Sequence, residues 1–237
     1  MMIAGTRGRA AIRGGLALTA IGLLLLAGVY VLALKYTPVE VRQGLAQKIF
    51  YLHAPAAWSA LLAFGLVGVV SVLYLWLQDP RLDLFAASSV EVGLAFCLVM
   101  LTTGPIWAKP IWGTWWTWDP RLTLTLLLFF IFLGYLALRA ALTDRSERGR
   151  FSAVIGIMGL LLVPFIHISV YLFRTMHPMP IVMKPDTLTG NTSLPPEMLR
   201  TVLFSFFVAT LLYAGFVMVR YGIAIRQYDR EEAQHEP

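Results

Sequence analysis

Charged side chains are scarce in this sequence. Asp, Glu, Lys and Arg make up 14% of its 237 residues, whereas 58% are hydrophobic and the mean hydropathy is +0.72. A soluble domain of this length could not bury so much apolar surface. The composition therefore excludes a soluble globular protein and predicts an integral membrane protein.

Cysteine is nearly absent, since Cys97 is the only one. The chain therefore has no intramolecular disulfide and no Cys-x-x-Cys-His motif for attaching c-type haem to itself. It also lacks a Gly-x-x-x-x-Gly-Lys-Ser/Thr loop, so any ATP-driven step has to come from another subunit. No Ser/His/Asp or Glu/His arrangement argues for hydrolysis, and we do not expect an enzyme.

Six apolar stretches are each long enough to cross about 30 Å of hydrocarbon as a helix of roughly 20 residues. We therefore expect one membrane domain, an all-α bundle of six transmembrane helices, followed by a cytoplasmic tail over residues 222–237. The basic and apolar start resembles a signal peptide, but it lacks a convincing cleavage site and is taken as a retained span. The expected spans are residues 12–34, 56–77, 84–103, 122–142, 153–173 and 201–221.

Basic residues are distributed unevenly about these spans. An even number of spans puts both termini on one side, which carries eleven of the 19 Lys and Arg residues, against eight on the other. This excess predicts cytoplasmic termini. Three long connections, residues 35–55, 104–121 and 174–200, then lie on the outer side, where binding groups are expected.

The second of these outer connections is rich in tryptophan. Five of the seven Trp residues fall within the range Trp107 to Trp118. Such a density of flat amphipathic side chains favours either the lipid headgroup boundary or the face of a planar ligand. Trp112, Trp115 and Trp116 stand at helical spacing, which predicts a short helix with all three on one face. The pair Asp119-Pro120 resembles the N-cap and first turn of the fourth span.

Two histidines lie at the expected outer boundary, His53 before the second span and His177 after the fifth. Imidazoles from two converging helix ends have the geometry to ligate one metal from opposite sides, as in bis-His haem. Alternatively, each is an amphipathic residue at an interface. Their shared face with the Trp-rich connection favours metal binding. His167, deeper in the fifth span, is expected to be structural, hydrogen-bonded for example to Ser169.

A porphyrin carries two carboxylates, so a haem site needs cations near its edge. Arg121 and Arg174 are the first choices, and the alternative is that outer cations meet lipid phosphates. The outer side offers Lys48, Lys109, Arg121, Arg174 and Lys184.

The residues from Trp112 to Thr123, Trp-Gly-Thr-Trp-Trp-Thr-Trp-Asp-Pro-Arg-Leu-Thr, resemble the tryptophan motif of the haem-handling proteins of cytochrome c maturation. Residues 51–57, Tyr-Leu-His-Ala-Pro-Ala-Ala, are similar to the CcmC family within that group, as is the spacing from His167 to His177. The resemblance covers roughly residues 47–220.

This resemblance implies a six-span protein of the bacterial cytoplasmic membrane that holds haem b transiently at the periplasmic face. His53 and His177 would be the axial ligands of the iron, and the Trp-rich segment would lie against the porphyrin. The implied partners are the haem chaperone CcmE, the ATP-binding cassette subunits CcmA and CcmB, and the small membrane protein CcmD; no nucleic acid is expected. The implied haem-binding residues are His53, His177, Trp112, Trp115, Trp116, Trp118, Asp119, Arg121 and Arg174.

Two other functions remain open on the residues alone. A membrane b-type cytochrome or quinone oxidoreductase subunit would retain its haem, but such haems usually need histidine pairs within the spans, and only His167 is that deep. A permease subunit could use Glu91, a carboxylate inside the third span, as part of a solute path. We favour instead that Glu91 reaches the interface or pairs with Arg81.

Overall fold

The computed structural model describes residues 4–178 and 194–235. Over these ranges the chain forms six long helices and no strand, and each helix is long and apolar enough to cross a membrane. The prediction of an all-α, six-span membrane protein is confirmed. The helices are α1 (Ala4–Val31), α2 (Phe50–Leu77), α3 (Pro80–Trp112), α4 (Pro120–Ala141), α5 (Arg145–Leu172) and α7 (Pro196–His235).

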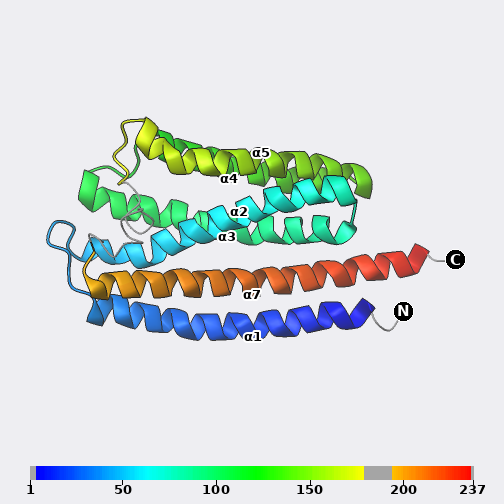
Figure 1. The fold of residues 1–237 in the computed structure, drawn as a ribbon, viewed down its shortest axis with the longest axis horizontal. Coiled ribbons are helices and arrows are strands. Elements are labelled where there is room, and N and C mark those ends of the chain that lie inside the picture. Colours follow the sequence, from blue (N-terminus) through cyan, green and yellow to red (C-terminus); the bar gives the residue numbers. More distant parts are fainter. Residues whose placement is uncertain (1–3, 179–193, 236–237) are drawn as a thin grey trace.

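The helices form an elongated bundle with both termini at one end (Figure 1). α1 packs along α7, α2 packs on both α3 and α5, and α4 packs on α5. The C-terminal ends of α1, α3 and α5 lie at the opposite end. Two short helical turns, a π-helix over Leu32–Tyr36 and a 3-10 helix over Leu45–Ile49, belong to the connection between α1 and α2.

Aspartates begin three of the helices. Asp79, Asp119 and Asp144 each accept a backbone N–H of the first turn, which satisfies a donor that has no partner within the helix. Pro120 follows in the first turn of α4, so the expected start of the fourth span is confirmed. Gly113 ends α3 with a φ of 75°, a left-handed conformation that glycine adopts without steric cost.

Most helices are longer than the apolar stretches that predicted them. α2 begins at Phe50, so His53 lies inside the helix and not before it. α3 continues through Pro105 and Pro110 to Trp112, which places Trp107 and Trp112 on a helix. α7 remains helical to His235, so residues 222–235 extend the last helix. Hydropathy marks only the apolar part of a helix, whereas backbone hydrogen bonding continues into polar residues.

The core between α2, α3, α4 and α5 is aromatic at its centre. Phe64 of α2 stacks on Phe132 of α4 with ring centroids 4.0 Å apart, and both side chains are fully buried. α1 and α7 also approach each other closely, because a Cβ on Gly15 would lie 2.7 Å from the carbonyl oxygen of Gly215. Small residues at this contact let the two backbones pack directly.

Three ion pairs connect helices away from the outer connections in the part of the chain that the structure describes, and one of them joins Arg145 of α5 to Glu231 of α7. Arg139 of α4 donates to Asp83 of α3 through both Nη atoms, at 2.5 Å from Nη1 to Oδ1 and at 2.9 Å from Nη2 to Oδ2, and both side chains are 12% exposed. Glu91 of α3 pairs with Arg220 of α7. The expectation that Glu91 pairs with Arg81 is therefore wrong: Arg81 binds Asp79 at its own helix start. The register of α3 against α7 decides this pairing, and sequence spacing does not reveal it.

Candidate functional site

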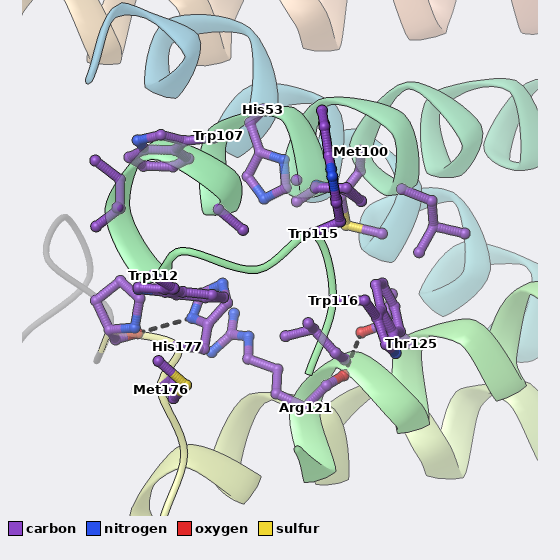
Figure 2. A pocket seen from close by; sticks show the side chains of 18 of the residues that line it. His53, Met100, Trp107, Trp112, Trp115, Trp116, Arg121, Thr125, Met176 and His177 are labelled. Atoms are coloured by element: carbon purple, nitrogen blue, oxygen red, sulfur yellow. Dashed lines mark hydrogen bonds between the residues drawn. The ribbon is translucent and has the colours of Figure 1, made fainter. Parts of the chain in front are cut away.

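A cavity of about 230 Å³ opens at the end of the bundle opposite the termini. α2, α3, α4 and the segment after α5 all contribute to its walls, together with the connection between α3 and α4. His53 and His177 both line it, although 124 positions separate them in the chain. Figure 2 shows the two imidazoles directed into this pocket from different elements.

His53 is held from α3. Its Nδ1 lies 3.0 Å from Oγ1 of Thr103, and its ring meets the indole of Trp107 edge to face, with centroids 5.8 Å apart. The Thr103 hydroxyl donates its own hydrogen to the carbonyl of Val99 at 2.7 Å. It therefore accepts from His53, which makes Nδ1 the protonated nitrogen and leaves the lone pair on Nε2.

His177 has the same tautomer, with the hydrogen on Nδ1, but a different contact fixes it. Its Nδ1 lies 2.9 Å from the backbone carbonyl oxygen of Pro178. A carbonyl only accepts, so Nδ1 carries the hydrogen and Nε2 again holds the lone pair. Burial, and then the charge of Arg121, lowers the pKa of His177 from 6.5 to about 4. The imidazole is therefore neutral at physiological pH, the form that binds a metal.

The tryptophans line the pocket from two structural contexts. Trp107 and Trp112 lie on α3, and the indole Nε1 of Trp107 donates to Oε1 of Gln43 at 3.0 Å. Trp115 and Trp116 lie in the non-helical segment 113–119 and also line the cavity. The short helix expected to align Trp112, Trp115 and Trp116 is wrong, because Gly113 ends α3 and the chain then runs irregularly to the α4 cap.

Trp118 does not line the main cavity. It is 76% exposed and meets Trp116 edge to face at 6.0 Å. Trp115 is 57% exposed although one side of it lines the cavity. The rim of the pocket therefore presents two large indoles to the outside. Trp116 is more buried, and its Nε1 has no hydrogen-bond partner within the described residues.

Among the described residues, Arg121 is the one cation that lines the pocket. It lies in the first turn of α4, and its guanidinium reaches across the pocket towards His177 (Figure 2). Nη1 of this side chain is buried and has no partner among the residues that the structure describes. A buried, unpaired guanidinium N–H is costly unless an acceptor is supplied. The site therefore offers a place for an anionic group.

The other expected site residues lie outside the lining. Asp119 caps α4 by accepting from the backbone N–H of Leu122 at 3.1 Å, and Arg174 is exposed. Lys48 donates to the carbonyls of Thr37 and Pro38, and Lys109 to that of Gly113. Lys184 lies outside the described residues. Arg121 is thus the first-choice cation that the structure brings to the cavity.

His167 is separate from the pair. It is half-buried on α5 and is not part of the cavity lining. Ser169, suggested as its partner, donates instead to the carbonyl of Ile166 at 2.8 Å. The described residues contain no cluster of three or more His, Cys, Asp or Glu that could hold a metal ion. Two imidazoles alone suit an ion whose remaining ligands come from a bound molecule.

Sequence reasoning missed the residues that hold His53. Thr103 and Gly104 lie on a different helix, and nothing in the spacing of residues about His53 indicates them. Met100, also buried at the pocket, and Gln43 were likewise not singled out. The sequence did single out Trp107, as part of the Trp-rich connection. In the structure Trp107 contacts both Gln43 and His53, so it was the available pointer to this wall of the pocket.

Comparison with known proteins shows the family to which the chain belongs. The model of the family described as CcmC, Heme exporter protein C, matches residues 9–236. Heme exporter protein C of Haemophilus influenzae is 33% identical, over 87% of this chain and 82% of its own length. Heme exporter protein C of Bradyrhizobium diazoefficiens is 36% identical, over 81% of this chain and 70% of its own.

A third relative comes from a plant. The putative cytochrome c biosynthesis ccmC-like mitochondrial protein of Marchantia polymorpha is 33% identical, over 86% of this chain and 85% of its own length. The family match spans all six helices, and the three relatives each align with most of the chain. This chain therefore belongs to the CcmC, or heme exporter protein C, family.

Proposed function

We propose that this protein binds haem through His53 and His177 at the aromatic pocket and delivers it to the haem chaperone CcmE during cytochrome c maturation. The observation that carries the proposal is a single cavity lined by two imidazoles whose Nε2 atoms hold the lone pair. Membership of a family named for heme export supports haem as the ligand. The chain would handle haem without bond-making chemistry of its own.

The residues fit haem in three respects. Two neutral imidazoles, those of His53 and His177, would hold the haem iron. Trp112, Trp115 and Trp116 offer flat apolar contact. The unpaired guanidinium of Arg121 offers a charge-assisted partner for a propionate. Haem supplies the iron that takes the imidazoles; the chain supplies orientation and the apolar surroundings.

The openness of the site favours delivery over retention. A cavity of about 230 Å³ is smaller than the roughly 300–1,000 Å³ typical of sites that enclose a small ligand. Part of the macrocycle would therefore stay at the rim, against Trp115 and near Trp118. A chaperone could reach an exposed edge, whereas an electron-carrying haem is normally enclosed between histidines within the spans.

We assign the pocket end of the bundle to the periplasm and both termini to the cytoplasm, on the basis of the excess of Arg at the terminal end. The CcmA and CcmB cassette pair would then meet this chain within the membrane and at its cytoplasmic end, with CcmD as a further membrane partner. ATP hydrolysis would belong to this cassette pair. The pairing of Glu91 with Arg220 removes the free carboxylate that motivated a permease.

The test is the absorption spectrum of the purified protein and of its His53→Ala and His177→Ala variants. We expect substoichiometric haem in the parent, an altered or lost spectrum in both variants, and an unchanged ligand field in His167→Ala. Co-expression with CcmE adds a transfer readout, the amount of covalently haem-loaded chaperone. An unchanged spectrum in both ligand variants would refute the assignment.

A further inference from the structure

We propose that Thr103 and Gly104 of α3 are positioning residues for His53, fixing its tautomer and ring orientation and raising its donor strength towards iron. This inference rests on the proposed role of His53 as a ligand. It concerns the side of the imidazole that faces away from the metal position. Ligating histidines generally need a partner on that nitrogen, and the partner tunes the ligand.

The first evidence is a directed chain of hydrogen bonds. Nδ1 of His53 lies 3.0 Å from Oγ1 of Thr103, and the Thr103 hydroxyl lies within donating distance of the Val99 carbonyl, at 2.7 Å. The hydroxyl has a single hydrogen, and the backbone carbonyl takes it. Thr103 is therefore an acceptor towards His53, and the imidazole has only one tautomer that satisfies the contact.

The second evidence is the space that Gly104 leaves. A Cβ built on Gly104 would lie 3.2 Å from Cε1 of His53 and 3.8 Å from its Nδ1. The first of these distances is tighter than normal packing, so a side chain here would push the ring. Cε1 is the atom between the two ring nitrogens, and a shift of it moves Nε2 as well. Gly104 thus allows the ring to sit against α3 at hydrogen-bond distance from Thr103.

The consequence for the ligand follows from ordinary imidazole chemistry. Donation of the Nδ1 hydrogen to an acceptor increases the electron density on Nε2, which stabilises oxidised iron relative to reduced iron. Loss of the acceptor should weaken the bond from His53 and raise the reduction potential of the bound haem. It should also free the ring to rotate and to exchange tautomers.

The chain offers matched variants for the test. Thr103→Val keeps the β-branched shape and removes the acceptor, and Thr103→Ser restores it. Thr102→Val is the control, because Thr102 is exposed and its hydroxyl donates only to carbonyls of its own helix, Leu98 at 2.9 Å and Val99 at 3.0 Å. Each full-length protein is purified in detergent, titrated with haem, and its bound haem is titrated with a reductant.

We expect Thr103→Val to lower haem affinity about tenfold and to raise the midpoint potential, with Thr103→Ser and Thr102→Val close to the parent. Gly104→Ala should alter the absorption spectrum while Thr103 is intact. In the haem-free protein, nitrogen-15 shifts of the His53 ring should report hydrogen on Nδ1 in the parent and a mixture of tautomers in Thr103→Val.

The outcomes separate this inference from the proposed function. If His53→Ala leaves the haem spectrum unchanged, the ligand assignment fails and this inference falls with it. If His53→Ala removes the ligand but Thr103→Val matches Thr102→Val in affinity, potential and ring shifts, the ligand stands and the positioning role is wrong. Failure of Thr103→Ser to restore the parent values would equally overturn it.

Discussion

Oε1 of Gln43 accepts a hydrogen bond from the indole Nε1 of Trp107 at 3.0 Å, which ties the connection after α1 to the outer end of α3. The same indole meets the His53 ring edge to face. Gln43 is therefore linked to His53, the proposed iron ligand, through the side chain of Trp107. The contact joins segments 64 residues apart and closes one wall of the pocket.

Gln43→Ala should weaken this wall. The indole N–H of Trp107 would lose its hydrogen-bond acceptor in partly buried surroundings. If the donor stays unsatisfied, the folded state is destabilised by about 1–3 kcal/mol. We expect lower haem retention and a shifted tryptophan fluorescence spectrum in the purified protein. Val41→Ala is the control, since Val41 is 96% exposed two residues away. Equal retention in the two variants would contradict a role for the Gln43 contact.

Arg121→Gln should reduce haem affinity through the carboxylates of the porphyrin. A charge-assisted hydrogen bond contributes about 1.5–3 kcal/mol, so the loss should be roughly tenfold or more. The dimethyl ester of haem lacks these carboxylates and should bind the parent and Arg121→Gln alike. Arg174→Gln is the control because Arg174 is exposed and outside the cavity lining. An equal loss for haem and its ester would argue against carboxylate recognition.

The membrane helices could be predicted from the sequence because an apolar run of this length leaves few alternatives to a span. The gathering of His53, His177 and Arg121 was suggested by their shared outer side, and the structure brings them to one cavity. Thr103 could not be found in this way, because its contact with His53 depends on how α2 and α3 are placed side by side. Sequence spacing reports neighbours along one helix only.

The errors in prediction have local physical causes. Helical spacing suggested one face for Trp112, Trp115 and Trp116, but Gly113 adopts a left-handed conformation and ends α3 between them. Glu91 was expected either to reach the interface or to pair with Arg81, whereas the interhelical register supplies Arg220. In both cases a backbone turn or a packing register overrode a periodic pattern.

The indoles at the rim should separate haem binding from haem transfer. Trp116 lines the cavity, so Trp116→Ala should weaken the free energy of haem binding by about 1 kcal/mol for each lost aromatic contact, and haem retention should fall accordingly. Trp118 is 76% exposed and lies beside the cavity, so Trp118→Ala should keep the haem spectrum and reduce loading of CcmE. Haem per protein and covalently loaded chaperone are the two measurements. If Trp118→Ala loses haem as readily as Trp116→Ala, the division of roles is wrong.

The spectrum of the haem complex should resist mild acid. The pKa of His177 lies at about 4, below its usual 6.5, because burial disfavours the charged imidazolium. Protonation therefore competes with iron only as the pH falls towards 4, and the His177 ligand should persist at pH 5.5. A spectrophotometric titration checks this. Acid should also destabilise the haem-free protein through this residue. Between pH 6.5 and pH 4 the His177 imidazole binds a proton in the unfolded chain but not in the folded one, so the free energy of unfolding falls as the pH drops from 6.5 towards 4.

The pair Asp83 and Arg139 should stabilise the bundle without affecting haem. Both side chains are 12% exposed, and Arg139 also donates to Ser152 of α5 at 3.3 Å, so three helices meet at this guanidinium. Arg139→Met would leave a buried carboxylate without its partner, which costs about 3–5 kcal/mol. We expect a lower melting temperature in detergent and an unchanged haem spectrum at low temperature. Arg81→Ala breaks a pair in which the arginine is 64% exposed, and it should leave the melting temperature close to that of the parent because solvent screens an exposed pair. Equal melting temperatures for the two variants would show that the buried Asp83–Arg139 pair stabilises the protein no more than the exposed Asp79–Arg81 pair.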